Sequence, residues 1–309
     1  MRGVEQRLAD GLKEYTHNIL KAEAGFKDVE ILAEVTPPAE ETHGHQPPPE
    51  EKAPPQPIPG VKKIIAVSSG KGGVGKSTVA VNLAVAAVKA GKKVGIMDAD
   101  IHGPSLPTLL HIEDGPGTEG DRMLPVEKYG IKGMSIGFIV EPGQPLIWRG
   151  PMLNKALEQL LDTTKWGDLD VLFLDLPPGT GDVQISLSQK YRIDGAIVVT
   201  TPQNLALEDV RRGAVMFQHT AVPVIGIVEN MSYYSCPNCG HESHPFGAGG
   251  GEKESSFLGI PLLGKIPLDP QIMVQSDSGE PVVLAEPEGG SAKSYLQVWE
   301  NVSNYIDSK

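Results

Sequence analysis

The sequence predicts a doubly wound α/β fold, in which a mostly parallel sheet carries helices on both faces. From Val61 onward, short runs rich in Val, Ile and Leu alternate with longer stretches of helical periodicity. Continuous apolar runs suit strands that are buried on both faces, and the alternation is typical of parallel βαβ units. A glycine-rich segment joins the first run to the first helical stretch. We therefore predict one α/β domain over residues 61–309.

The expected elements of this domain follow one another in regular alternation. Apolar runs predict strands over residues 63–68, 93–98, 171–175, 196–200, 224–228 and 262–266. Helical periodicity predicts helices over residues 76–90, 152–161, 183–190, 205–219 and 251–258, and a final one over residues 291–306 that packs on the outside.

The first 60 residues differ in composition from the rest of the chain. Residues 1–35 have helical spacing followed by a short strand pattern, but so short a segment is too small for an independent core. We interpret it as an N-terminal appendage, the tail of a truncated domain. Residues 36–60 are rich in Pro and Glu and almost free of large apolar residues, which predicts a disordered linker.

Composition excludes several classes of protein. The chain has 27 Lys and Arg against 39 Asp and Glu, a net charge of −12, so we expect no nucleic-acid partner. Apolar runs such as residues 195–200 are far shorter than the roughly 18 residues that a membrane span needs, so no membrane partner is expected either. The first residues lack the pattern of a targeting peptide, and two cysteines cannot form a disulfide framework. These features favour the cytoplasm.

The glycine-rich segment after the first strand has the pattern of a phosphate-binding loop, G-x-x-x-x-G-K-[ST]. It reads Gly70-Lys71-Gly72-Gly73-Val74-Gly75-Lys76-Ser77-Thr78. Its glycines allow backbone N–H groups to turn toward phosphate oxygens, while Lys76 supplies charge and Ser77 can hold Mg²⁺. The following helix adds its positive dipole end. The pattern predicts a nucleotide site in a fold of the P-loop NTPase type.

Two acidic sites follow other predicted strands. Asp98 and Asp100 lie at the end of the second strand, and Asp175 ends the strand over residues 171–175. A carboxylate directly after an apolar strand is costly unless it faces a cation. Because the carboxyl ends of parallel strands meet at one edge of a sheet, these groups are expected beside the phosphate-binding loop and its Mg²⁺.

The detailed motifs resemble one family. Lys71, the second residue of the loop, resembles the signature lysine of the deviant Walker A loop in the MinD/ParA/iron-protein class of ATPases. Longer strings resemble the Mrp family of iron-sulfur cluster carrier ATPases. They are DADIHGPS at Asp98–Ser105, WRGPM at Trp148–Met152, DLPPGTGD at Asp175–Asp182 and ENMSYYSCPNCG at Glu229–Gly240. The resemblance covers about residues 61–307.

The resemblance implies a Mg²⁺-dependent ATPase that forms a homodimer with nucleotide at the interface. It assigns catalytic roles to Lys71, which would reach the phosphates of the partner subunit, and to Lys76, which would bind them within its own subunit. Asp100 would orient the attacking water, and Asp175 would contact Mg²⁺ through its second coordination shell. These roles agree with the charge stabilisation that phosphoryl transfer requires.

The same resemblance assigns the binding contacts of ATP. Ser77 would bind Mg²⁺ and Thr78 the region of the α-phosphate, while Asn230 and the loop at Pro267 would frame adenine. The remaining contacts are expected from the loop backbone at Gly70, Gly72, Gly73, Val74 and Gly75.

Both cysteines of the chain occur in one motif, Cys236-Pro-Asn-Cys239-Gly, and three interpretations of it remain open. Two chains could each give two thiolates to a bridging [4Fe–4S] cluster, as the resemblance implies. The same four sulfurs could hold Zn²⁺, or His241 and His244 could complete a zinc site within one chain. A redox dithiol is the third possibility, although such pairs usually open a helix and Gly240 favours a loop.

The function expected from these features is that of an ATP-hydrolysing carrier. It would hold a labile bridging [4Fe–4S] cluster and pass it to apo-proteins, with a cluster-assembly scaffold as a further partner. The alternative is a spatial regulator like ParA or MinD with a structural zinc at the cysteines. That function calls for a basic patch or an amphipathic terminal helix, and residues 295–307 carry little positive charge.

Overall fold

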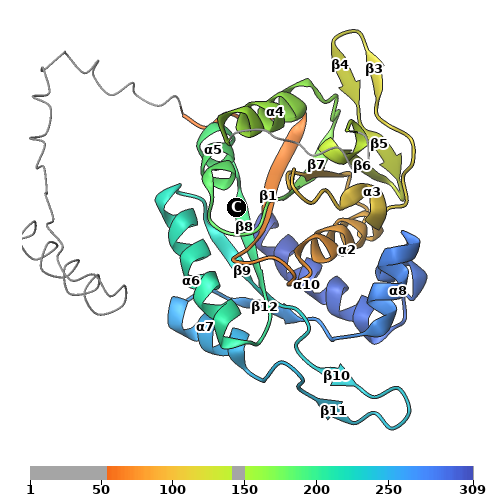
Figure 1. Ribbon diagram of the computed structural model, residues 1–309, viewed down its shortest axis with the longest axis vertical. Coiled ribbons are helices and arrows are strands. Elements are labelled where there is room, and N and C mark those ends of the chain that lie inside the picture. The colour runs from red at the N-terminus through yellow and green to blue at the C-terminus, as the bar shows by residue number, and fades with distance from the viewer. Residues whose placement is uncertain (1–53, 141–149, 309) are drawn as a thin grey trace, which may run out of the picture. The chain divides into compact units, whose positions relative to one another are not determined.

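The computed structural model of the chain describes residues 54–140 and 150–308 (Figure 1). The appendage expected over residues 1–35 and most of the linker expected over residues 36–60 lie outside the described residues, as do Trp148 and Arg149. In the described ranges, none of the helices combines the length and the apolar character that crossing a membrane would require.

A single sheet of eight strands organises the domain. The strands are β1 (Val61–Ser69), β2 (Val94–Asp98), β5 (Val126–Lys128), β6 (Ile131–Ser135), β7 (Leu169–Asp175), β8 (Gly195–Thr200), β9 (Val224–Glu229) and β12 (Leu262–Lys265). Their order is β12-β9-β8-β1-β7-β2-β6-β5, and all neighbours are parallel except β5, which runs antiparallel to β6. The six predicted strands all occur in it, and the doubly wound, mostly parallel fold is confirmed.

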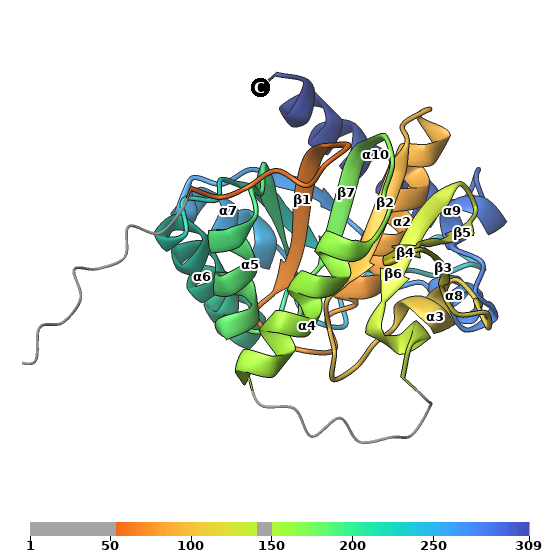
Figure 2. The same ribbon diagram turned by 90° about the horizontal axis from the view of Figure 1, so that it is seen from above.

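Helices cover both faces of the sheet (Figure 2). One face is covered by α2 (Lys76–Lys89) and α10 (Gly290–Asp307), with the shorter α3 (Leu106–Leu109), α8 (Pro270–Ser278) and α9 (Val282–Ala285) beside them. The other face is covered by α4 (Gly150–Thr163), α5 (Asp182–Lys190) and α6 (Asn204–His219), and α7 (Gly250–Leu258) packs beside α6 and β9.

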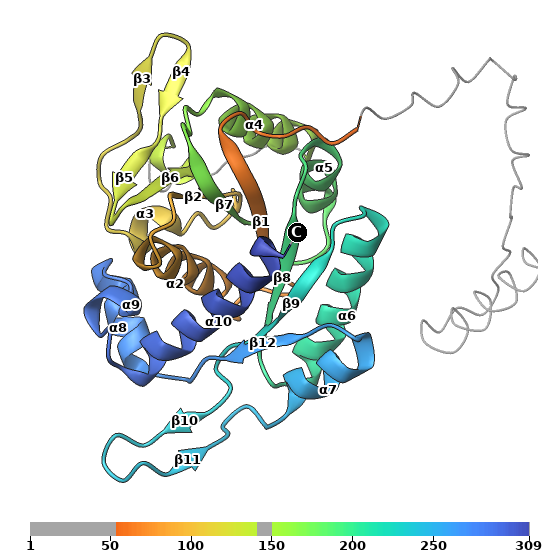
Figure 3. The ribbon, with the colours of Figure 1, turned by 180° about the vertical axis from the view of Figure 1, so that it is seen from behind.

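The C-terminal helix α10 lies across the sheet next to α2, as Figure 3 shows. Its side chains at Tyr295, Val298, Trp299 and Val302 are buried in the core. The Trp299 ring meets Phe173 of β7 edge to face, with 6.0 Å between the ring centroids. The apolar face of this helix is therefore used in packing against the sheet.

Several short elements were not predicted. They are the strands β5 and β6, the hairpins β3 (Gly117–Glu119) with β4 (Arg122–Leu124) and β10 (Tyr234–Ser235) with β11 (Glu242–Ser243), the helices α3, α8 and α9, and a 3₁₀ turn at Ile136–Phe138. These segments are brief and mix polar with apolar residues, so periodicity alone does not identify them. β6 is a strand because all five of its residues pair with β2.

Candidate functional site

Three neighbouring strands deliver the site residues to one edge of the sheet. β1 pairs with β7, and Val67 is opposite Asp175. β2 pairs with the other side of β7, where Asp98 is opposite Asp175. The phosphate-binding loop follows β1 directly and leads into α2. The structure therefore brings the loop and both acidic segments together, at the carboxyl ends of parallel strands where ligands of such sheets bind.

The backbone of the loop has the conformation that its glycines permit. Gly73 and Gly75 have φ angles of 80° and 79°, which are unfavourable for residues with a Cβ. A Cβ on Gly75 would also collide with the side chain of Asn230, whose Nδ2 donates a hydrogen bond of 2.8 Å to the carbonyl oxygen of Val74. Asn230, expected at adenine, thus fastens the loop to the end of β9. Its adenine contact stays a prediction.

The start of α2 suits an anion. In the described chain no side chain caps this helix, and its first turn carries no acidic residue, so its N–H groups keep their positive potential. Apart from the adjacent residues of the chain, no described atom lies within 4 Å of where a Cβ would stand on Gly72 or Gly73, so the loop is open on that side. These features fit the phosphates of a nucleotide.

Lys76 and Asp175 form a buried ion pair across the loop. The Lys76 Nζ bonds the Asp175 Oδ1 and lies 3.2 Å from the Ser77 Oγ, and the two side chains are only 7% and 3% exposed. Burial raises the pKa of Asp175, while the charge of Lys76 opposes that shift. A hydroxyl and a carboxylate side by side are oxygen ligands that suit Mg²⁺. The donor set therefore fits the expected metal.

Asp98 was expected beside the phosphate-binding loop, but sequence reasoning gave it no role of its own. It is buried, and it accepts hydrogen bonds from the backbone N–H groups of Asp100 (3.1 Å), Ser105 (2.8 Å) and Leu106 (3.1 Å) and from the Ser135 hydroxyl (3.0 Å). Asp98 thereby shapes the loop that carries Asp100, the residue expected to orient water. The sequence placed both carboxylates at the end of this strand, but it could not show which one is held by the backbone N–H groups.

The environment of Asp98 disfavours the charged form of its carboxyl group. Burial, the larger effect, together with the nearby Asp175 raises the pKa of Asp98 to about 6 from an ordinary 3.8, although its backbone hydrogen bonds oppose the shift. Between these two values the folded protein holds a proton that the unfolded chain has lost. The contribution of Asp98 to stability is therefore greatest at low pH and falls as pH rises through the folded pKa.

A comparison of wild type with Asp98→Asn tests this effect. Asparagine does not titrate, so only the wild type should lose stability from this position as pH rises. We expect the stability of the wild type relative to the variant to fall by ~3 kcal/mol between about pH 4 and about pH 7. Urea unfolding of both proteins across this range measures it. Equal pH dependence in the two proteins would contradict the assignment.

Lys71 lies at the outer side of the loop. Its Nζ is 3.4 Å from Oε1 of Gln203 at an exposed position, and its carbonyl oxygen accepts a hydrogen bond of 2.9 Å from the Ser69 hydroxyl. Gly70 beside it is in close contact with Asp209 of α6. The structure thus places Lys71 at the surface next to the start of α6, and its action on a partner subunit stays a prediction.

Both cysteines lie at the tip of the β10–β11 hairpin, which extends away from the sheet in Figure 1. Cys236 is half-buried and Cys239 exposed, and both are free thiols. The Cys236 N–H donates to the His241 carbonyl (3.0 Å), and the Gly240 N–H donates to the Cys236 carbonyl (2.8 Å). The backbone N–H groups of Asn238 and Cys239 lower the pKa of the Cys236 thiol. The turn therefore favours the thiolate of Cys236, and the pair does not open a helix as in thioredoxin-like proteins.

The two histidines after the motif do not join the cysteines. The His244 Nδ1 lies 3.3 Å from the Ser232 carbonyl oxygen, and its Nε2 lies 3.5 Å from Oε1 of Glu242. Within residues 54–140 and 150–308, no three His, Cys, Asp or Glu side chains gather in a way that could hold a metal ion. In the described structure the chain offers two sulfurs at this turn and no assembled Cys₂His₂ set.

The base of the hairpin is fastened to the sheet. The buried carboxylate of Glu229 accepts hydrogen bonds from the Ser232 hydroxyl and the Gly251 N–H. The Ser232 N–H donates to the Ile266 carbonyl (2.9 Å), and the Leu268 N–H donates to the Tyr233 carbonyl (2.6 Å). The hairpin thus leaves the sheet beside the segment that follows β12.

That segment includes Pro267, the second residue expected at adenine. Pro267 is buried and lines a pocket of about 630 Å³, together with residues of the hairpin base such as Tyr233 and Ser235. The pocket separates the turn of the cysteines from the start of α8. The contact of Pro267 with adenine stays a prediction.

Comparison with protein families gives one match that covers most of the chain. Residues 60–303 match the model described as "ParA: NUBPL iron-transfer P-loop NTPase". Among curated proteins, the iron-sulfur cluster carrier protein of Aquifex aeolicus is 51% identical over 255 residues, which are 82% of this chain and 70% of that protein. The iron-sulfur cluster transfer protein NUBPL of Mus musculus is 47% identical over 256 residues, 82% of this chain and 80% of its own.

Solved structures agree with the fold. A nucleotide-binding protein from Archaeoglobus fulgidus, in complex with ADP, is 39% identical with a TM-score of 0.66, over 76% of this chain and 92% of that one. The cell division ATPase MinD of Pyrococcus furiosus is 25% identical with a TM-score of 0.58, over 78% of this chain and 98% of that one.

Proposed function

This chain belongs to the ParA/NUBPL family of iron-transfer P-loop NTPases, and from that membership we propose that it is an ATP-hydrolysing iron-sulfur cluster carrier. It would hold a labile [4Fe–4S] cluster between two copies and transfer it to apo-proteins. The names of relatives that are about half identical over four fifths of the chain support this function.

The observation that carries the proposal is the pair of thiols at the hairpin tip. A [4Fe–4S] cluster needs four thiolates, and the described residues of one chain bring two together with no further metal-ligating group beside them. A second copy would supply the other two. Because the turn is exposed and each chain gives only two ligands, the cluster would be held loosely, as a cargo must be.

The nucleotide site would supply the enzymatic step. The loop backbone and Lys76 would bind the phosphates, with Asp100 holding the attacking water in line. Ser77 would hold Mg²⁺ directly and Asp175 through its second coordination shell, and the metal neutralises phosphate charge when bound. As the family resemblance implies, Lys71 would approach the phosphates of the partner subunit, and its surface position next to α6 is compatible with that role. Hydrolysis would then require the same homodimer that the cluster requires.

The partners would be apo iron-sulfur proteins and a cluster-assembly scaffold, and the cytoplasm would be the place of action. The alternative, a spatial regulator like MinD or ParA with a structural zinc, has less support. A membrane-binding helix needs a free apolar face, whereas that of α10 is buried against the sheet.

Anaerobic reconstitution with iron and sulfide tests the proposal. We expect the wild type to acquire the visible absorbance of an iron-sulfur cluster, with four iron and four sulfide per dimer, and to restore an apo-[4Fe–4S] enzyme. Cys236→Ala should abolish both, because the remaining two thiolates per dimer cannot hold the cluster. Metal and sulfide analysis, with light scattering for oligomeric state, measures the outcome.

A double variant, His241→Ala with His244→Ala, is the matched control. It should bind the cluster as the wild type does, since neither imidazole is needed for a four-sulfur site. A colourless wild-type protein with one Zn²⁺ per dimer would overturn the proposal in favour of the zinc alternative. Zinc bound by a monomer and lost in the histidine variant would point to the Cys₂His₂ site.

A further inference from the structure

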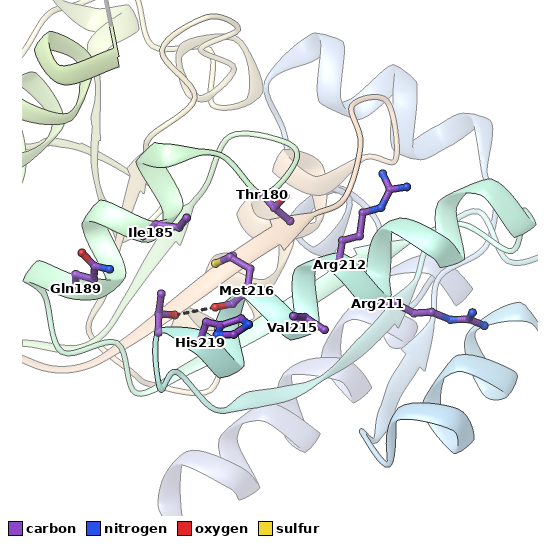
Figure 4. A pocket seen from close by; sticks show the side chains of 9 residues that line it. Thr180, Ile185, Gln189, Arg211, Arg212, Val215, Met216 and His219 are labelled. Atoms are coloured by element: carbon purple, nitrogen blue, oxygen red, sulfur yellow. Dashed lines mark hydrogen bonds between the residues drawn. The ribbon is translucent and has the colours of Figure 1, made fainter. Parts of the chain in front are cut away.

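A groove runs between α5 and α6 on the side of the sheet away from α2 (Figure 4). Its volume is about 550 Å³, and we call it the α5/α6 groove. The residues that matter for its chemistry are Thr180, Ile185, Arg211, Arg212, Val215 and His219. None of them belongs to the nucleotide site or to the cysteine turn.

The floor of the groove is apolar and accessible. Ile185 of α5 and Met216 of α6 line it, and Val215 is 47% exposed. The exposed side chain of Phe257, from α7, extends this apolar surface beyond Arg211, because the Arg211 guanidinium lies 4.5 Å from the centroid of its ring. Concave apolar surface next to exposed aromatic and arginine side chains is typical of protein interfaces.

The rim of the groove is basic although the chain as a whole is acidic. Arg211, Arg212 and His219 line it, and no acidic side chain does among the described residues, while the net charge of the chain is −12. Arg211 is held in place by two hydrogen bonds to Glu254, of 2.8 and 2.7 Å. The Arg212 side chain is 70% exposed and its contact with Asp209 is 3.4 Å long. Because Glu254 already pairs with Arg211, the exposed Arg212 is the charge of this rim that favours an acidic partner.

One end of the groove is formed by the loop that follows Asp175. Thr180 of this loop lines the groove, and the neighbouring Gly179 N–H donates a hydrogen bond of 2.8 Å to the Ser69 carbonyl, directly before the phosphate-binding loop. The buried Gln184 holds the same loop through a bond of 2.6 Å to the Pro177 carbonyl. The groove therefore shares one loop with the nucleotide site.

We propose that the α5/α6 groove binds an acidic amphipathic helix of a partner protein, and that nucleotide binding changes its affinity for that helix. Arg211, Val215 and His219 recur at every fourth residue of α6, so they form a ridge about two turns long. A helix lying beside this ridge would bury its apolar face on Val215 and Ile185 and present a carboxylate to the exposed Arg212. Because the two sites share a loop, each ligand alters the affinity for the other.

Two synthetic fluorescent helices about four turns long test the proposal, one with Leu on one face and Glu elsewhere, the other with Lys in place of Glu. We expect the full chain to bind the acidic helix and not the basic one, with an affinity that differs between the nucleotide-free protein and the ADP complex. Fluorescence anisotropy measures both. No binding of the acidic helix up to about 1 mM, equal binding of the two helices, or no effect of ADP would overturn the proposal.

Substitutions in the groove localise the binding. Val215→Asp and Arg212→Glu should each weaken it at least about tenfold, because one removes apolar contact and the other reverses the charge. Met273→Asp on α8 and Lys293→Glu on α10 are matched controls on exposed residues elsewhere and should have no effect. All four variants should bind ADP normally.

Two results would contradict this localisation. Unchanged binding of the helix in both groove variants would place its site elsewhere. A change of the wild-type oligomeric state in these variants would make the groove a contact between copies of this chain. Because the measurement involves no metal, its failure would leave the cluster proposal standing, and failure of cluster binding would leave the groove proposal standing.

Discussion

Replacing Lys76 by Met should lower the free energy of unfolding by about 3–5 kcal/mol in the absence of nucleotide. Lys76 neutralises Asp175, and both side chains are buried, so the substitution leaves a carboxylate unpaired in the interior. The pKa of Asp175, already raised by burial, would rise further as the group takes up a proton. Urea unfolding near neutral pH measures the loss, and ATP hydrolysis should be abolished together with phosphate binding.

The double variant Lys76→Met with Asp175→Asn separates the structural effect from the catalytic one. Without the unpaired carboxylate, most of the lost stability should return, whereas hydrolysis should not. If the double variant is no more stable than Lys76→Met alone, the buried ion pair is not the cause of the loss. If either variant hydrolyses ATP at the wild-type rate, the role of Lys76 at the phosphates is wrong.

Replacing Lys71 by Ala should lower ATP turnover and leave the free energy of unfolding almost unchanged. Its Nζ is at the surface near Gln203, so stability should hardly change, while ATP turnover should fall by about 10²–10³-fold if the lysine acts in the transition state. ATP binding should be nearly unaffected, because Lys76 and the loop backbone remain. Steady-state hydrolysis and binding of a fluorescent ATP analogue measure the two effects. Gln203→Ala is the control. The Gln203 amide contacts Lys71 but is not expected at the phosphates, so this variant should keep most of the ATP turnover.

Mixing two inactive proteins tests whether Lys71 acts across the dimer. Asp100→Ala should also lose turnover, because the attacking water would lack its carboxylate. In a mixed dimer of Lys71→Ala with Asp100→Ala, one site would combine an intact Asp100 with the intact Lys71 of the partner subunit. Activity should therefore reappear on mixing. If both single variants are inactive and the mixture stays inactive although mixed dimers form, Lys71 acts within its own subunit.

The sequence predicted the centre of the sheet well and its margins poorly. Strands such as β7 are buried on both faces, so their apolar runs are unmistakable. β6 contains Lys132 and Gly133 within five residues, and only its pairing with β2 makes it a strand. α8 could have been found, because Asp269 caps its N-terminus and Pro270 occupies its first position, a common start signal.

In the site, too, features encoded by a local sequence motif were predictable, whereas contacts between distant segments of the chain were not. The contiguous loop motif and the strand-end carboxylates predicted that Asp175 would lie beside the loop that carries Lys76. The bond from Asn230 to Val74 and the contact of Lys71 with Gln203 join residues more than 100 positions apart. No local pattern specifies such contacts, since they depend on how the strands are ordered. The α5/α6 groove is likewise formed only when two helices pack side by side.

The hydrogen bonds at the base of the β10–β11 hairpin limit how far local unfolding can extend when the cysteine sulfurs are oxidised. Ser232 and Tyr233 are tied to the segment after β12, and both thiols lie beyond these ties. Oxidation or alkylation at the tip would thus open a few residues locally and leave the cooperative unit beneath intact. If the proposed cluster were lost to air, the protein would keep its fold and could bind a cluster again once its thiols are reduced.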